Sequence, residues 1–73
     1  MQRLTIAAAR DYVGGYYDSL DRRVSYDIEG AGLIRVDGST VCRLNVVTSE
    51  GVHCWDVFEE DDGCGGVCLR GEF

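Results

Sequence analysis

The sequence predicts an α+β fold in which an N-terminal helix packs on one face of an antiparallel β-meander of about five strands. Apolar residues recur at steps of three and four in the first twenty residues, and from residue 24 onward the period changes to two. Two acidic-glycine dipeptides, Asp37-Gly38 and Glu50-Gly51, separate alternating segments and are strong hairpin signals. One helix followed by a run of strands is typical of the α+β class.

The helix is predicted over residues 5–20. Thr5 is a suitable N-cap, and one apolar stripe runs from Ile6 through Val13 to Leu20. Gly14-Gly15 interrupts this stripe, and each glycine lowers helix stability by ~1 kcal/mol relative to alanine. Either the helix breaks there or the glycines let its backbone lie close to a sheet. We predict a helix that continues with a weak point.

Five strands are predicted, over residues 24–29, 33–37, 40–48, 52–59 and 67–71. The pairing follows from a three-residue turn at 30–32, a three-residue turn at 37–39 and a two-residue turn at 50–51. This register places Val46 opposite Trp55 and Ile28 opposite Ile34, and it produces one apolar and one polar face. The predicted core contains Ile6, Val13, Leu20, Tyr26, Ile28, Ile34, Val36, Leu44, Val46, Trp55, Val57 and Leu69. The predicted wet face carries Asp27, Glu29, Arg43, Asn45, Asp56 and Arg70.

The length and the charge of the chain limit the classes of function. Seventy-three residues make one domain with a thin core, and the formal net charge is -6. That charge argues against direct binding of nucleic acid, which needs a basic face. No apolar run is long enough to span a membrane or to form a signal peptide, so we expect a cytoplasmic protein.

Four consecutive acidic residues, Glu59 to Asp62, come directly before Gly63 and are predicted to form an exposed loop between the last two strands. Such a run repels itself and projects a negative field, which steers association with a basic protein surface. A role in solubility alone is the competing interpretation. The candidate partner-binding residues are Asp27, Glu29, Asp37, Asp56, Glu59, Glu60, Asp61 and Asp62.

No catalytic, cofactor or metal site is predicted, and we expect a protein that is not an enzyme. Cys42 and Cys54 point to opposite faces in the predicted register, which favours four reduced thiols over a zinc site or disulfides. A calcium ion bound by the acidic run lacks the ligand alternation of an EF-hand. His53 is predicted opposite Thr48 at the end of a hairpin, as an exposed residue without a role.

A small acidic domain with one helix, an antiparallel sheet and an exposed Glu59-Glu60-Asp61-Asp62 run resembles the small phage-encoded inhibitors of the anti-CRISPR type. The resemblance is one of overall profile, because those proteins share no motif, and it carries no site residue over. It implies a DNA mimic that blocks a basic protein, such as a CRISPR effector subunit, in the host cytoplasm. The open meander leaves two edges, so a monomer or an edge-strand homodimer is expected. The alternative function is a small zinc-binding or structural module built on the cysteines.

Overall fold

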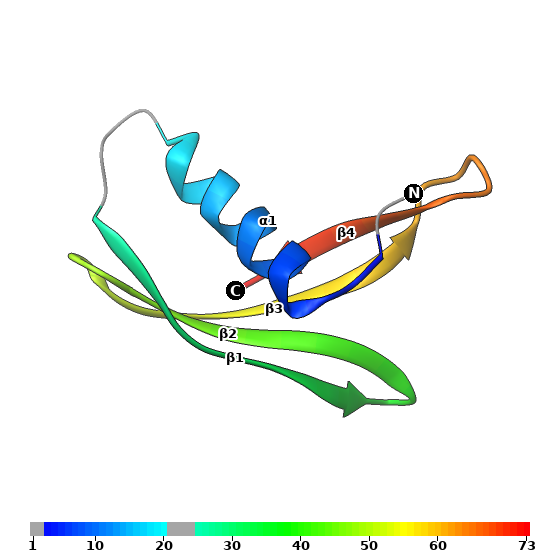
Figure 1. Cartoon of the computed structure of the whole chain (residues 1–73), viewed down its shortest axis with the longest axis horizontal. Coiled ribbons are helices and arrows are strands. Elements are labelled where there is room, and N and C mark those ends of the chain that lie inside the picture. The colour runs from blue at the N-terminus through cyan, green and yellow to red at the C-terminus, as the bar shows by residue number, and fades with distance from the viewer. Residues whose placement is uncertain (1–2, 21–24) are drawn as a thin grey trace.

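A computed structural model describes residues 3–20 and 25–73. It contains one helix, α1 (Ile6–Asp18), and four strands, β1 (Tyr26–Val36), β2 (Ser39–Thr48), β3 (Gly51–Asp61) and β4 (Val67–Glu72). The strands form one antiparallel sheet in the order β1-β2-β3-β4, and α1 lies across one face of it (Figure 1). The α+β class is therefore confirmed, but within the described residues the sheet has four strands and not five.

Helix α1 begins after Thr5, whose side chain accepts a hydrogen bond of 3.0 Å from the backbone N–H of Ala8. The helix runs through Gly14 and Gly15 without a break, as predicted. Its buried residues are Ala9, Val13 and Tyr17, which are spaced by four and form one stripe. Ile6, which was expected in the core, is 39% exposed because it lies off this stripe.

Strand β1 covers most of the first two predicted strands, of which residue 24 lies outside the described residues, and the turn expected at residues 30–32 is a β-bulge. Gly30 is the extra residue, because Glu29 pairs with Asn45 and Ala31 pairs with Leu44. Gly30 has a φ of 64°, a conformation that glycine adopts readily. The chain therefore continues in the same direction, and the predicted pairing of Ile28 with Ile34 is wrong.

The bulge and the following turn change which face the second half of β1 presents. The turn is two residues long, with Asp37 and Gly38 both at positive φ, as type I′ hairpins require. Leu33, and not Ile34, consequently lies opposite Cys42. Because a shift of one residue inverts the alternation, Ile34 and Val36 point away from the helix and do not belong to the core.

The β2–β3 hairpin turns at Ser49-Glu50, one residue earlier than predicted, so Thr48 pairs with Gly51. This moves the pairing by two residues: Leu44, and not Val46, lies opposite Trp55. A shift of two keeps every side chain on its predicted face. The apolar and polar faces of these two strands are therefore as predicted.

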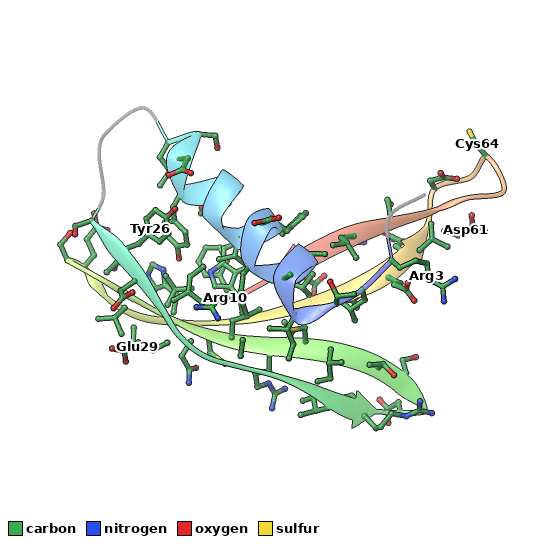
Figure 2. The ribbon with its side chains drawn as sticks, in the orientation of Figure 1. Arg3, Arg10, Tyr26, Glu29, Asp61 and Cys64 are labelled. Atoms are coloured by element: carbon green, nitrogen blue, oxygen red, sulfur yellow. The ribbon has the colours of Figure 1, made fainter. Side chains whose placement is uncertain are left out.

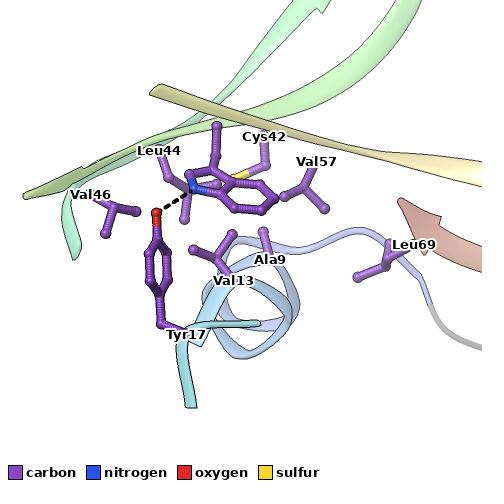
Figure 3. Close-up of a cluster of buried hydrophobic side chains, with 9 residues drawn as sticks. Ala9, Val13, Tyr17, Cys42, Leu44, Val46, Val57 and Leu69 are labelled. Atoms are coloured by element: carbon purple, nitrogen blue, oxygen red, sulfur yellow. Dashed lines mark hydrogen bonds between the residues drawn. The ribbon is translucent and has the colours of Figure 1, made fainter. Parts of the chain in front are cut away.

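The core lies between α1 and the face of the sheet that it covers. Figure 3 shows the cluster, in which Tyr17 from the helix meets the buried side chains of three strands. Its buried members are Ala9, Val13, Tyr17, Cys42, Leu44, Val46, Trp55, Val57 and Leu69. Leu20, Tyr26 and Ile28 pack against this cluster and are partly buried, in agreement with the prediction.

Within the part of the chain that the structure describes, no helix is long and apolar enough to cross a membrane.

Candidate protein-binding surface

The face of the sheet opposite α1, here called the outer face, is covered by none of the described elements. Register assigns its side chains, because neighbours along a strand point to opposite faces. It carries five carboxylates and two guanidinium groups, from Asp27, Glu29, Arg43, Asp56, Glu60, Arg70 and Glu72. The residues predicted for the polar face, Asp27, Glu29, Arg43, Asn45, Asp56 and Arg70, therefore all lie on this face.

The two arginines of the outer face neutralise one part of this surface. Arg43 donates two hydrogen bonds to Asp56, from Nε at 2.8 Å and from Nη2 at 3.1 Å. Arg70 lies 3.1 Å from Glu60 and 3.4 Å from Glu72, with one guanidinium nitrogen on each carboxylate. Arg43 pairs with Asp56 directly across the two strands. Asp56 and Glu60 are thus charged but already paired.

Asp27 and Glu29, by contrast, are exposed and make no ion pair or hydrogen bond among the described residues. They lie two residues apart on edge strand β1 and therefore share the outer face. Glu29 projects away from the helix side of the sheet (Figure 2). Asp37 is in the turn at the opposite end of β1, so the structure does not bring it near these two.

The acidic run does not form the loop that was expected. Strand β3 extends through Asp61, so Glu59 and Glu60 point to opposite faces of the sheet. Asp61 accepts a hydrogen bond of 3.1 Å from the N–H of Gly63. Asp62 accepts from the N–H groups of Cys64 at 2.7 Å and Gly66 at 3.0 Å. The four carboxylates are distributed over two faces and a turn, and they do not converge on one cation.

The Arg43–Asp56 pair gives a pH-dependent contribution to stability. The hydrogen bonds from Arg43 and its positive charge hold the pKa of Asp56 below its ordinary 3.8, against a smaller opposing effect of burial. Because the folded pKa is the lower one, this stabilisation is complete above pH 3.8 and is lost as the pH falls through the folded pKa. Both side chains are more than a third exposed, so we expect under ~1 kcal/mol.

Urea unfolding of the wild type and of Asp56→Asn, followed by circular dichroism between pH 7 and pH 2, measures this contribution. The variant should be slightly less stable at neutral pH, and the difference should vanish at the acid end. A difference that stays constant over the whole range would contradict the assignment.

The four cysteines are free and lie in different environments. Cys42 is buried on the helix face, where burial raises the pKa of its thiol and a backbone hydrogen bond at Gly32 partly offsets the effect. Cys54 is exposed on the outer face, and Cys64 is at the tip of the β3–β4 loop (Figure 2). Cys68 pairs with Glu60 across β3 and β4. No three His, Cys, Asp or Glu side chains among the described residues form a group suited to a metal ion.

His53 is half-buried and is not the exposed residue that the sequence predicted. Its Nδ1 lies 2.6 Å from the hydroxyl oxygen of Tyr17, which also accepts a hydrogen bond of 3.0 Å from Nε1 of Trp55. The ring of Phe73 stacks on His53 with centroids 5.3 Å apart. The corrected register explains the difference: it leaves His53 on the helix face but moves its partner from Thr48 to Val46, and so places it further from the end of the hairpin.

Tyr17, Tyr26, His53, Trp55 and Phe73 form a group that we call the aromatic cluster. Sequence analysis missed it, since its hydrogen bonds join residues that are far apart in the chain. Tyr26 stacks on Tyr17 with centroids 5.1 Å apart and donates a hydrogen bond of 3.1 Å to Asp18. That hydrogen bond, assisted by burial, raises the pKa of Tyr26. The one available signal was the density of aromatic residues at positions 12, 16 and 17 of the helix.

Comparisons of the chain with protein-family models, with characterised proteins and with solved structures find no match.

Proposed function

We propose that this protein is a non-enzymatic binding protein that uses the acidic outer face of its sheet to bind a basic surface on another protein. The observation that carries the proposal is the uncovered outer face with five carboxylates against two guanidinium groups. Complementary charge of this kind accelerates association and selects the partner.

The class of partner follows from the chemistry of the surface. A protein that binds nucleic acid offers a basic groove lined by arginine and lysine. Carboxylates held at fixed positions on a sheet would occupy the places of phosphates in such a groove and exclude the nucleic acid. The resemblance to small phage-encoded inhibitors suggests a CRISPR effector complex as the first partner to test.

The first experiment is affinity capture from a bacterial lysate that contains an active CRISPR effector complex, at low and moderate salt, with mass spectrometry of the retained proteins. Capture of an effector subunit that added target DNA abolishes supports the proposal. Capture that is insensitive to DNA and to salt contradicts a role for the acidic face. Retention of no effector subunit at either salt level rejects the CRISPR effector as the partner.

Glu29→Lys should slow association with the captured partner by about tenfold at low salt, because it reverses an outer-face charge that has no ion pair among the described residues. Asp11→Lys is the matched control, since it changes the net charge equally at an exposed position of α1. Association rates measured by surface plasmon resonance at two salt concentrations distinguish the two variants. Equal effects of both would show that only the total charge matters.

A further inference from the structure

Strand β4 forms one edge of the sheet, and among the described residues no strand lies beside its open side. The other edge strand, β1, is interrupted by the bulge at Gly30, which hinders pairing with a further strand. Strand β4 has no bulge, because its register with β3 is continuous from Val67 to Glu72. A regular, uncovered edge of this kind is a template for pairing with another chain.

One hydrogen bond identifies the peptide groups that point to the open side of β4. The N–H of Asp62 donates to the carbonyl oxygen of Gly66 at 3.3 Å, in the same register as the β3–β4 pairing. Hydrogen-bonded and non-hydrogen-bonded pairs alternate along an antiparallel ladder, so every second residue after Gly66 bonds to β3. The peptide groups that point to the open side therefore belong to Leu69, Gly71 and Phe73.

The side chains near the end of β4 alternate between the two faces of the sheet. Arg70 and Glu72 project from the outer face, where they are 52% and 61% exposed. Leu69 and Phe73 project from the helix face, where the ring of Phe73 contacts Trp55. Gly71 lies between the two charged residues. The outer side of this edge therefore presents one cation and one anion, two positions apart.

Two copies of β4 can pair antiparallel about a two-fold axis in only a few registers that match face with face. With the axis at Gly71, Arg70 of each copy lies directly opposite Glu72 of the other. With the axis at Arg70 or at Glu72, two like charges face each other, which is destabilising. With the axis at Leu69 or an earlier residue of β4, no opposite charges of this strand meet. Only the axis at Gly71 pairs opposite charges.

The direction of the peptide groups strengthens this register. Gly71 opposite Gly71 and Leu69 opposite Phe73 form hydrogen-bonded pairs, because their peptide groups point to the open side. Arg70 and Glu72 then meet as non-hydrogen-bonded pairs. In such pairs the two Cα atoms are only about 4.5 Å apart and the side chains are closest. Both cross-copy ion pairs are therefore placed where side-chain interaction across strands is strongest.

The contacts within one chain leave Glu72 able to change its partner. Nη1 of Arg70 donates to Oε1 of Glu60 at 3.1 Å, whereas Nη2 lies 3.4 Å from Oε1 of Glu72. The longer contact joins two exposed side chains and is weak. Glu72 can therefore turn to the Arg70 of a second copy while Arg70 keeps its contact with Glu60.

We propose that two copies of this chain pair through β4, antiparallel and with the two-fold axis at Gly71, to form one continuous sheet. The axis is perpendicular to the sheet, so both helices lie on one side and the two outer faces join on the other. The pairing is short, so we expect half-dissociation at a concentration on the order of 100 µM. The inference does not depend on the proposed function, since Asp27 and Glu29 lie on the opposite edge strand.

Sedimentation equilibrium of the wild type, from about 10 µM to about 1 mM, tests the pairing. A reducing buffer keeps the exposed cysteines, Cys54 and Cys64, from linking two chains. The weight-average mass should rise with concentration toward the mass of a dimer. A mass that stays at that of one chain over the whole range overturns the inference.

Two single variants and their mixture test the register. Glu72→Arg and Arg70→Glu each place like charges opposite each other, and each should weaken self-association by at least about tenfold. Mixed in equal amounts, they should form a heterodimer, because every facing pair is again of opposite charge. Glu50→Arg, in the β2–β3 turn, changes the net charge as Glu72→Arg does and should leave self-association unchanged. Self-association that Glu72→Arg does not weaken, or a mixture that stays monomeric, overturns the inference.

Amide hydrogen exchange in the wild type tests the same register, which keeps the inference falsifiable if a variant does not fold. Pairing covers the N–H groups of Leu69 and Gly71, so their exchange, followed by NMR, should slow severalfold between dilute and concentrated protein. Arg70 and Glu72, whose N–H groups point to β3, should change less. Exchange at Gly71 that does not depend on concentration, or slowing confined to β1, overturns the inference.

Discussion

Replacing Trp55 with alanine should destabilise the protein by about 3–5 kcal/mol, which is comparable to the whole stability expected of so small a domain. The Trp55 side chain is 2% exposed and lies in the centre of the aromatic cluster. Its ring centroid is 4.4 Å from that of Phe73 and 5.0 Å from that of Tyr16. Truncation removes this apolar contact and leaves a cavity between the helix and the sheet. We therefore expect Trp55→Ala to be largely unfolded at 25 °C.

Trp55→Phe separates the packing of the ring from its hydrogen bond. Phenylalanine keeps an aromatic ring but cannot donate to Tyr17, as Nε1 does at 3.0 Å in the wild type. Loss of a donor to a buried hydroxyl that still contacts His53 should cost about 1–2 kcal/mol. Urea unfolding followed by far-ultraviolet circular dichroism measures both variants, because neither retains tryptophan fluorescence. A loss below 1 kcal/mol in Trp55→Ala would show that the cluster is not the centre of the core.

The sequence was most informative where a local signal was sufficient. The spacing by three and four along α1 and the alternation in β2 and β3 depend on neighbouring residues. The helical spacing correctly placed Val13 in the core, although Ile6 is exposed, and the alternation correctly assigned the two faces of β2 and β3. The error in the β2–β3 turn was harmless, because a shift of two residues leaves Trp55 and Val57 on the helix face.

Gly30 shows what local sequence does not determine. A glycine at positive φ serves a turn and a bulge equally well, so residues 30–32 alone do not indicate whether the chain reverses. The continued pairing of β1 with β2, which ends at Val36 and Ser39, decides in favour of a bulge. Once the bulge is taken as a turn, Ile34 and Val36 are assigned to the wrong face.

The candidate surface was predictable only in part, because some of its features depend on strand pairing and not on local sequence. The outer-face positions of Asp27, Glu29 and Asp56 followed from alternation, and the structure agrees. The division of Glu59 and Glu60 between two faces depends on where β3 ends, and four acidic residues in a row suggested an earlier end. The separation of the β1–β2 hairpin end from the β3–β4 hairpin end depends on how far three separate pairings extend, which no short segment encodes.

Gly71→Ala should destabilise the fold by about 1–3 kcal/mol, although the same change at Gly15 should stabilise it by about 1 kcal/mol. Gly71 faces the helix from β4, and an added Cβ would lie 2.6 Å from Cε1 of Tyr12 and 3.0 Å from two ring carbons of Trp55. The ring of Tyr12 is half-buried and has some freedom to move, but Trp55 is fixed by the core. The close approach of α1 to the sheet therefore requires glycine at this position.

Gly15 is the matched control for this change, because a Cβ added there meets nothing within 4 Å. Alanine lowers the conformational entropy of the unfolded chain at both positions, so that effect alone would make both variants more stable. Thermal unfolding by circular dichroism should instead show a raised midpoint for Gly15→Ala and a lowered one for Gly71→Ala. A stabilised Gly71→Ala would mean that helix and sheet are not packed this closely. Each substitution adds one methyl group, yet the two changes in stability should have opposite signs. The reason is that Gly71, unlike Gly15, lies where the helix and the sheet touch.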